Sequence, residues 1–405
     1  MTDASAPYWW QRDDLKYQDG SLLFAGHDVN RLVKRHGTPA FFYSAERLTD
    51  NARRLHAALQ KAGMKDRYRI LFAMKANRFA PLLTHLKSTG LVGIDACSPN
   101  EVEHALSCGF RPEDISFTNT SLSRNDYERL NRFEGMAMNC DSLTCIRKWG
   151  EMGRGRNIGI RVNPSIGLGR ADNDKLQYSG ANTTKFGIYR EQFHEAIALA
   201  RDYDLTITRI HFHTGCGYLT PQLDEWEDII KACLWFVDQV ADTVTVVNVG
   251  GGLGVPHTYY DQPLDLDRWA QILARHFLDR KLSIEVEPGD YLVKDCGILA
   301  MTVNTVELKK DRCFVGVNAG FNIALEPAVY GLPFQPVPVN ERTGEKQKVS
   351  IAGHINEALD IFCTDIELPP LEEEDSLVLI NAGAYSSSMA SNHCMRGDYR
   401  EFVLF

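Results

Sequence analysis

Lys75 and His213 are two residues whose types and places in the sequence could do chemistry. Lys75 closes the apolar run in FAMKAN, where loss of water would lower the pKa of its amine and make it a nucleophile toward an aldehyde. His213 closes the run ITRIHFHTG and could stack on a flat ring. Taken singly, the lysine also fits a solvated surface and the histidine a hydrogen-bonded core position. Other residues that could join the same site are therefore needed to choose between these interpretations.

A glycine run and an acid add to this pair. Gly250, Gly251 and Gly252 offer consecutive unhindered N–H groups, which suit a phosphate. Glu287 precedes Pro-Gly and could face a pyridine nitrogen and keep it protonated, so that the ring withdraws electrons. An amine for an aldehyde, a stacking ring, a phosphate cradle and an acid together predict pyridoxal 5′-phosphate as the cofactor.

Short apolar runs must position these residues. Eight runs rich in β-branched residues alternate with amphipathic, helix-like stretches, at 69–76, 91–97, 115–119, 136–140, 158–164, 207–215, 244–252 and 282–289. This alternation predicts an α/β fold, a (β/α)8 barrel of the alanine racemase type, which carries its active site at the C-terminal ends of the strands. All four groups stand at the ends of such runs.

The alternation of strand-like and helix-like segments stops after residue 297. Residues 298–405 contain strand-like runs separated by Pro, Gly and acidic clusters, which predicts a C-terminal antiparallel β domain. The extended segment at residues 1–36 is expected to lend strands to that domain. The barrel is then expected to occupy residues 37–297.

Composition excludes several classes of function. Lys plus Arg number 44 and Asp plus Glu 53, for a net charge of −9 with no basic block, so we predict no nucleic-acid partner. The apolar runs are only as long as strands, so we predict no membrane partner. Ten cysteines without CxxC pairs are ordinary for a reducing compartment, and we predict a cytoplasmic protein.

Several motifs, in order along residues 37–405, resemble those of the fold-type III pyridoxal-phosphate enzymes. The closest resemblance is to the diaminopimelate decarboxylase-like branch of the alanine racemase/ornithine decarboxylase superfamily, carried by FAMKAN, GIDACSPNEVEHAL, TKFGI, HFHTGC, VNVGGGLG, EVEPG and GAYSSSMAS. The resemblance implies cofactor contacts from Lys75, Asp95, His213, Cys216, Gly250, Gly251, Gly252, Glu287 and Tyr385. Cys216 stands where the family has a phosphate-binding serine. The resemblance also implies a homodimer in which each chain completes the active site of the other.

Two positions depart from the pattern of that branch in the sign of their charge. The branch reads E-P-G-R after the eighth strand and R-P-x-L-Y in the β domain, where the second arginine grips the distal carboxylate of diaminopimelate. This chain has Asp290 and Glu326 in place of the arginines and keeps the tyrosine as Tyr330. Because carboxylates repel a distal carboxylate, we expect a substrate with a cationic far end, such as lysine, ornithine or arginine, or a specialised-pathway intermediate. Alternatively, both acids pair with a local Lys or Arg, or the loss of the first arginine weakens the hold on the cofactor.

A third departure affects the protonation step. The C-E-S-G-D motif of the family, whose cysteine protonates the carbanion, aligns with Asn356, Glu357 and Asp360 at its first, second and fifth positions. Asparagine is no general acid at neutral pH. We expect either Tyr330 or a water held by Glu357 to deliver the proton, or a different fate for the carbanion.

These residues predict an amino-acid α-decarboxylase, a carbon–carbon lyase that depends on pyridoxal phosphate. Lys75, His213, Asn356 and Glu357 are the expected catalytic residues, and Asp290, Glu326, Tyr330, Asn356 and Asp360 are expected to contact the substrate. A decarboxylative oxidase or transaminase, a racemase or epimerase, and a non-catalytic cofactor-binding protein remain as alternatives. The pair His211-x-His213 also fits a metal-dependent amidohydrolase. It lies late in the chain and the last strand ends in Glu-Pro-Gly, so we predict no metal site.

Overall fold

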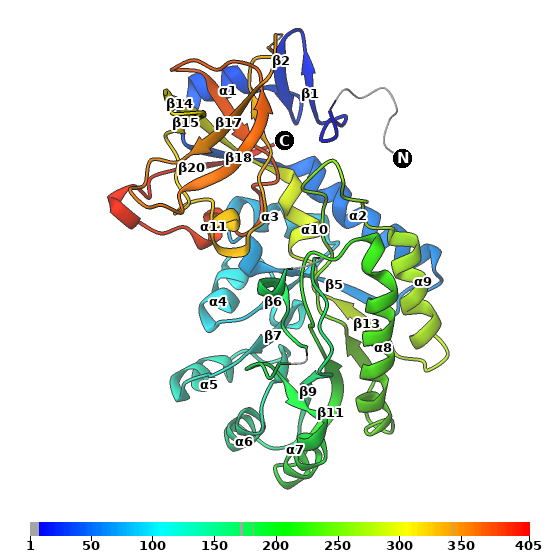
Figure 1. The fold of residues 1–405 in the computed structure, drawn as a ribbon. Coiled ribbons are helices and arrows are strands. Elements are labelled where there is room, and N and C mark those ends of the chain that lie inside the picture. The colour runs from blue at the N-terminus through cyan, green and yellow to red at the C-terminus, as the bar shows by residue number, and fades with distance from the viewer. Residues whose placement is uncertain (1–7, 171–172, 181, 343) are drawn as a thin grey trace.

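The chain forms a barrel and a β domain that share a hydrophobic core, and a second, smaller core lies between the N-terminal segment and the β domain. The computed structural model describes residues 8–170, 173–180, 182–342 and 344–405, with the barrel below and the β domain above in Figure 1. Buried side chains of both parts, such as Phe72 of the barrel and Val315 of the β domain, belong to one continuous cluster. No helix among these residues is both long enough and apolar enough to cross a membrane.

Eight parallel strands close into the barrel. They are β5 (Tyr68–Ala73), β6 (Gly93–Ala96), β7 (Ile115–Asn119), β8 (Ala137–Cys140), β9 (Arg156–Asn163), β11 (Leu205–His211), β12 (Val246–Asn248) and β13 (Ser283–Val286). The pairings of β13 with β5 and of β8 with β9 complete the ring. Each predicted apolar run corresponds to one strand in the same order, so the (β/α)8 prediction is confirmed.

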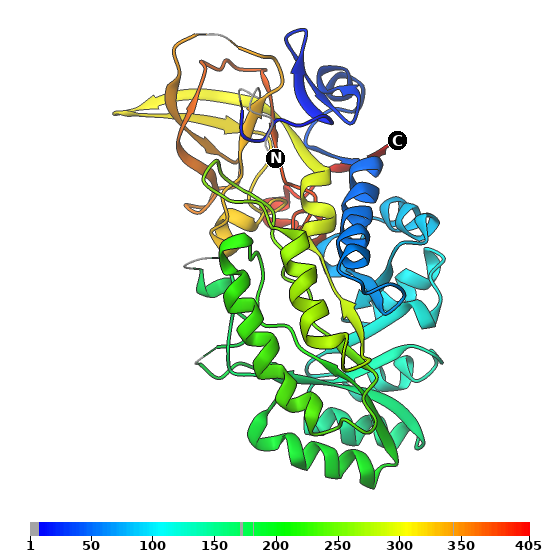
Figure 2. The ribbon, with the colours of Figure 1, turned by 90° about the vertical axis from the view of Figure 1, so that its right-hand side faces the viewer.

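Helices cover the outside of the barrel, as the turned view in Figure 2 shows for residues 190–277. The barrel helices are α2 (Ala45–Lys61), α3 (Ala80–Thr89), α4 (Pro99–Ser107), α5 (Arg124–Leu130), α6 (Leu143–Met152), α7 (Arg190–Asp202), α8 (Leu223–Asp238) and α9 (Leu266–Phe277). Local sequence explains their limits. In α4, the Ser98 hydroxyl accepts from the N–H of Glu101, Pro99 stands in the first turn, and Val102 and Ala105 are buried.

The β domain is a mixed sheet in which most neighbours are antiparallel. Its strands are β4 (Ala40–Ser44), β14 (Gly297–Lys309), β15 (Arg312–Val317), β16 (Pro336–Pro338), β17 (Gln347–Ala352), β18 (Ile361–Leu368), β19 (Ser376–Leu379) and β20 (Arg400–Leu404). The pairs β15–β17 and β20–β4 are parallel, so the expectation of an antiparallel domain is right for most of the sheet and wrong for these two pairs.

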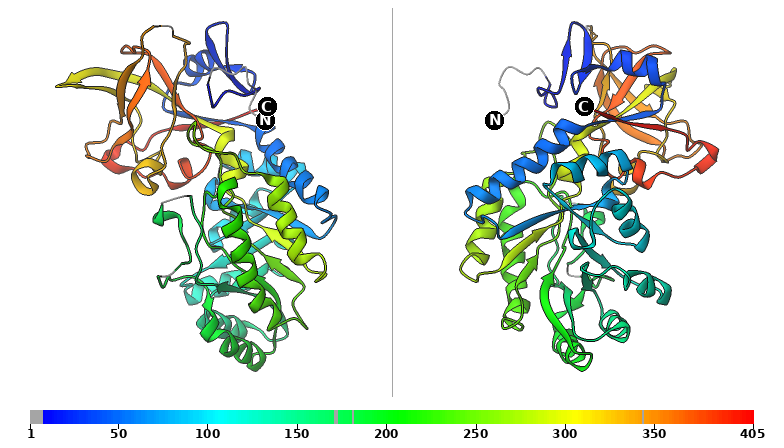
Figure 3. Two further views of the ribbon diagram at one scale, coloured as in Figure 1. Left: turned by 45° about the vertical axis from the view of Figure 1, so that its right-hand side comes forward. Right: turned by 180° about the vertical axis from the view of Figure 1, so that it is seen from behind.

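The N-terminal segment lies against the β domain. β1 (Leu15–Gln18), β2 (Ser21–Phe24) and β3 (His27–Asp28) form a small sheet of their own, followed by α1 (Val29–His36). The N–H of Leu22 donates to the carbonyl of Val339 at 2.8 Å, which joins this small sheet to the β domain. β4 then pairs with both β14 and β20, and Figure 3 shows the first and last strands of the domain side by side.

The chain passes from the barrel to the β domain beside the ends of the barrel strands. After β13 it runs through α10 (Asp290–Val293) and a 3₁₀ turn (Lys294–Cys296) directly into β14. A second short helix, α11 (Glu326–Tyr330), follows β15. These short elements carry several of the charged residues described below.

Candidate active site

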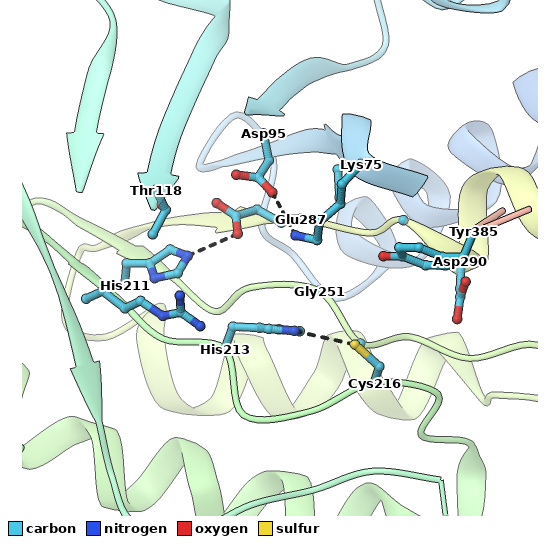
Figure 4. Close-up of a pocket in the computed structure, with 14 residues that line it drawn as sticks. Lys75, Asp95, Thr118, His211, His213, Cys216, Gly251, Glu287, Asp290 and Tyr385 are labelled. Atoms are coloured by element: carbon cyan, nitrogen blue, oxygen red, sulfur yellow. Dashed lines mark hydrogen bonds and ion pairs between the residues drawn. The ribbon is translucent and has the colours of Figure 1, made fainter. Parts of the chain in front are cut away.

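A pocket opens at the C-terminal ends of the barrel strands. Its lining consists of Ala73, Lys75, Asp95, Thr118, Arg161, His211, His213, Cys216, Gly251, Gly252, Glu287, Gly289, Asp290 and Tyr385. Figure 4 shows Glu287 and His211 toward one end, Tyr385, Asp290 and Cys216 toward the other, and Lys75 between them. The barrel thus gathers the predicted amine, ring, glycines and acid in one place.

Lys75 stands in a 3₁₀ turn (Met74–Ala76) directly after β5. Its Nζ lies 3.5 Å from Oδ2 of Asp95, the residue before the last of the neighbouring strand β6. Burial by itself lowers the pKa of Lys75, but the charge of Asp95 and the nearby Cys97 and Tyr385 raise it well above the usual value. The expectation of a lowered pKa is therefore wrong, because the sequence did not show that a carboxylate would face the amine.

Asp95 is itself perturbed. Burial and the charge of Glu287 raise the pKa of Asp95 to about 7, although Lys75 opposes the shift. Near neutral pH this carboxyl group can therefore hold or release a proton next to the amine of Lys75.

Glu287 is held as a carboxylate by two donors. The Nε2–H of His211 donates to its Oε2 at 3.0 Å, and the amide of Asn248 donates to its Oε1 at 2.6 Å. Burial alone raises the pKa of Glu287, but His211, Lys75 and Asn248 bring it down to about 2. An ionised carboxylate in this position is suited to accept a hydrogen bond from a protonated ring nitrogen.

The glycine run is shaped by close packing. Gly250 and Gly252 have φ of +69° and +97°, which other residues rarely adopt, and a Cβ on Gly251 would lie 2.1 Å from the carbonyl oxygen of Glu287. The N–H of Gly250 is already donated to Oδ1 of Asn248 at 2.9 Å. Within the described parts of the chain, the N–H groups of Gly251 and Gly252 have no acceptor. These two donors can cradle an anion.

Tyr385 reaches the pocket from the β domain. Its backbone has φ of +50°, and its N–H donates to the carbonyl of Ala76 at 2.9 Å, which fixes the residue beside Lys75. Its hydroxyl lies next to Gly289, where a Cβ would approach within 3.1 Å. Tyr385 therefore closes the end of the pocket at which Asp290 and Cys216 lie.

His213 and Cys216 form the floor seen in Figure 4, with Cys216 Sγ 3.5 Å from His213 Nε2. The ring of Tyr178 packs against His213 with centroids 4.8 Å apart. Burial, Lys75 and Arg161 hold the pKa of His213 well below its usual value, so the ring is neutral. Burial and the charge of Asp290 raise the pKa of Cys216 to about 12, so its sulfur stays a neutral thiol.

The two acids at the departures from the family pattern share one lysine. Lys294 is fully buried and places its Nζ 3.2 Å from Asp290 Oδ1 and 2.5 Å from Glu326 Oε1. Asp290 lines the pocket, whereas Glu326 lies behind it. The alternative that both acids pair with a local cation is therefore what the structure shows. The sequence signal was the spacing of Lys294 four residues after Asp290, which places the two on one helical face.

The residues of the altered C-E-S-G-D segment lie elsewhere. Asn356 is exposed in the loop between β17 and β18, and Glu357 pairs with His393 at 3.1 Å. Asp360 is buried and accepts from the N–H groups of Phe321 and Ile355, each at 2.6 Å. None of these three predicted site residues lines the pocket of its own chain, as far as the described residues go.

Four other residues lie where the sequence did not predict them. Tyr330 is not part of the lining, and its hydroxyl contacts Met389 Sδ at 3.9 Å. Thr118, Arg161 and His211 do line the pocket, although the sequence analysis gave them no cofactor or substrate role. The signal that could have found them is the two-residue period of a strand, which turns alternate side chains of β7, β9 and β11 into the barrel.

The residues of the pocket fit pyridoxal phosphate. Lys75 supplies an amine for its aldehyde, and Gly251 and Gly252 supply open N–H donors for its phosphate. Glu287 supplies a carboxylate for the ring nitrogen, and His213 a neutral ring beside it. The fit rests on an amine, anion-binding N–H donors and a carboxylate that line one pocket and match the aldehyde, phosphate and ring nitrogen of the cofactor.

Comparisons with known proteins agree with this chemistry. The sequence profile described as pyridoxal-dependent decarboxylase, pyridoxal binding domain, matches residues 48–294, and the profile of the C-terminal sheet domain of these decarboxylases matches residues 240–383. Diaminopimelate decarboxylase of Methanothermobacter thermautotrophicus is 34% identical over 399 residues, which cover 95% of this chain and 90% of the relative.

Solved structures show the same architecture. Diaminopimelate decarboxylase of M. jannaschii in complex with L-lysine is 26% identical, with a TM-score of 0.86, and the match covers 97% of this chain and 93% of that one. The arginine decarboxylase of Paramecium bursaria Chlorella virus shares the fold, with 18% identity, a TM-score of 0.81 and coverage of 93% and 99%. The predictions of the cofactor and of a carbon–carbon lyase are confirmed. This chain belongs to the family of pyridoxal-dependent amino-acid decarboxylases.

Proposed function

We propose that this enzyme removes the α-carboxylate of an amino acid with a cationic far end, in preference to diaminopimelate. The observation that carries the proposal is Asp290, whose carboxylate lines the Lys75 pocket where the family pattern has an arginine. Asp290 and Glu326 share the single positive charge of Lys294, so the two ionised acids keep one net negative charge beside the pocket. That charge would repel a distal carboxylate and attract a distal ammonium.

Each residue of the pocket has a role that follows from its position. When bound, pyridoxal phosphate supplies an electron-withdrawing ring that accepts the electron pair left by carbon dioxide. Lys75 would hold the cofactor through its aldehyde. Glu287, kept ionised by His211 and Asn248, would accept a hydrogen bond from the ring nitrogen and favour its protonated form. Asp95 lies 3.5 Å from the Lys75 amine and keeps that amine protonated until the cofactor is attached.

We further propose that a second copy of the chain completes each site. Asn356 and Glu357 are exposed on the β domain and absent from the pocket of their own chain, which suits residues that act on a neighbouring chain. Mixing Lys75→Ala chains with Glu357→Gln chains tests this, since a hybrid dimer would contain one intact site. Recovery of about a quarter of wild-type activity on random exchange supports the proposal. No recovery in chains shown to exchange contradicts it.

A panel of amino acids tests the substrate proposal. Lysine, ornithine, arginine, diaminopimelate and norleucine are offered to the holoenzyme, and carbon dioxide, hydrogen peroxide and product mass are measured together. We expect carbon dioxide and the corresponding amine from a dibasic amino acid, with Lys75→Ala as the inactive control. Faster decarboxylation of diaminopimelate than of every dibasic amino acid would refute the proposal, and hydrogen peroxide would identify oxidation of the carbanion.

A further inference from the structure

Lys294 lies at the centre of a buried charged cluster behind the wall of the pocket. It follows α10 and its Nζ faces Asp290 Oδ1 at 3.2 Å, Glu326 Oε1 at 2.5 Å and His257 Nε2 at 3.5 Å. The side chain of Lys294 is fully buried, and that of Glu326 is 1% exposed. Of the two carboxylates, only Asp290 reaches the pocket.

Lys294 has no N–H group to offer a substrate. Its side chain is fully buried and does not line the pocket, and its neighbours Asp290, Glu326 and His257 are all acceptors. His257 acts as an acceptor because its Nδ1–H donates to the carbonyl of Pro333 at 3.0 Å, and burial and Lys294 keep its pKa well below the usual value. The cluster therefore presents a carboxylate to the pocket.

The cluster lacks one positive charge. Two carboxylates and one ammonium leave a net charge of −1 when both acids are ionised. Among the described residues, no hydrogen-bond donor reaches the buried Glu326 Oε2, and the buried Asp290 Oδ1 has Lys294 Nζ 3.2 Å away but out of hydrogen-bond alignment. Buried acceptors of this kind are costly unless a donor fills them. A ligand that brings one ammonium group next to Asp290 balances the charge.

We propose that Glu326 and Lys294 set the charge that Asp290 presents, and so select an amino acid that ends in a primary ammonium group. Glu326 competes with Asp290 for Lys294. When Glu326 is ionised, Lys294 is shared and Asp290 keeps excess negative charge for the substrate. When Glu326 is protonated, Lys294 neutralises Asp290 and the preference for a cation is lost. This inference rests on the proposed function and adds two specificity-determining residues to it.

The other charged groups around the cluster are accounted for. Arg170 lies near Glu326 but forms an ion pair with Asp261, whose Oδ2 also accepts from the N–H of His257 at 2.7 Å. Tyr330 faces Glu326 as a neutral phenol, because burial and Cys216 raise its pKa. The remaining partner of Glu326 is Lys294, and burial raises the pKa of Glu326 to about 7 although Lys294 opposes the shift. The switch in preference is therefore expected near neutral pH.

Binding of 1,5-diaminopentane and pentylamine to the holoenzyme tests the inference, because neither has a carboxylate to lose. Their dissociation constants are measured from the change in cofactor absorbance between about pH 6 and pH 8. In the wild type, the diamine is expected to bind about tenfold more tightly than the monoamine, and this ratio is expected to rise with pH through about 7. Glu326→Gln should remove most of the preference and its pH dependence.

Three further variants sharpen the result. Glu326→Asp keeps the charge and should restore part of the preference, and Asp290→Asn should abolish it at every pH. Glu373→Gln removes an exposed acid of the β domain and serves as the matched control. An unchanged diamine preference in both Glu326→Gln and Asp290→Asn would overturn the inference. If the diamine preference behaves as expected but no dibasic amino acid loses carbon dioxide, the proposed function falls and the charge selection stands.

Discussion

Asn248 joins the acid of the site to the glycine cradle, and its removal makes a quantitative prediction. This fully buried side chain donates to Glu287 Oε1 at 2.6 Å and accepts from the N–H of Gly250 at 2.9 Å. Asn248→Ala removes a hydrogen bond to a charged group, at about 1.5–3 kcal/mol, and leaves the Gly250 N–H unpaired, at about 1–3 kcal/mol. We therefore expect a loss of several kcal/mol, divided between protein stability and cofactor binding.

The assay separates these two parts. The urea midpoint of the cofactor-free protein reports stability, and an absorbance titration reports the dissociation constant of pyridoxal phosphate. Asn248→Asp keeps the acceptor for Gly250 but places a second carboxylate against Glu287. In acid, the new carboxyl group and Glu287 can share a proton, so this variant should retain more stability than Asn248→Ala. As pH rises the shared proton is lost and the two carboxylates repel each other, so cofactor affinity should fall. A change below about 1 kcal/mol in both measurements for Asn248→Ala would refute this reasoning.

The remaining predictions concern the amine and the phosphate end of the pocket. Asp95→Asn removes the carboxylate that raises the pKa of Lys75. The neutral amine then becomes more abundant at pH ~7, so stopped-flow absorbance should show faster attachment of the cofactor. A slower rate would contradict the assignment. Cys216→Ser replaces a weak donor by a hydroxyl, which should tighten phosphate binding by about fivefold in equilibrium dialysis. Binding that is unchanged or weaker would contradict a contact between Cys216 and the phosphate. Lys75→Ala should abolish the cofactor linkage that borohydride traps, as mass spectrometry of the reduced protein would show.

The barrel could be predicted because its signals are local. Each buried parallel strand is a short run such as ISFTN, and the residues of that run are enough to predict the strand. The active site of a barrel lies where those strands end. Lys75, His213 and Glu287 were found in this way. The parallel pairs of the β domain were not found, because the partner of β17 or β20 depends on chain paths that no short segment records.

Residue types at the ends of the strands therefore determined the fold, the cofactor and most of the pocket. Tertiary structure alone decided the charge state of the site, since electrostatic energy depends on distance and burial rather than on position in the chain. It placed Asp95 against Lys75, which reversed the expected direction of the lysine pKa. It also brought Glu326 to Lys294, which turned two apparent charge inversions into one shared, buried cluster with a single unbalanced carboxylate.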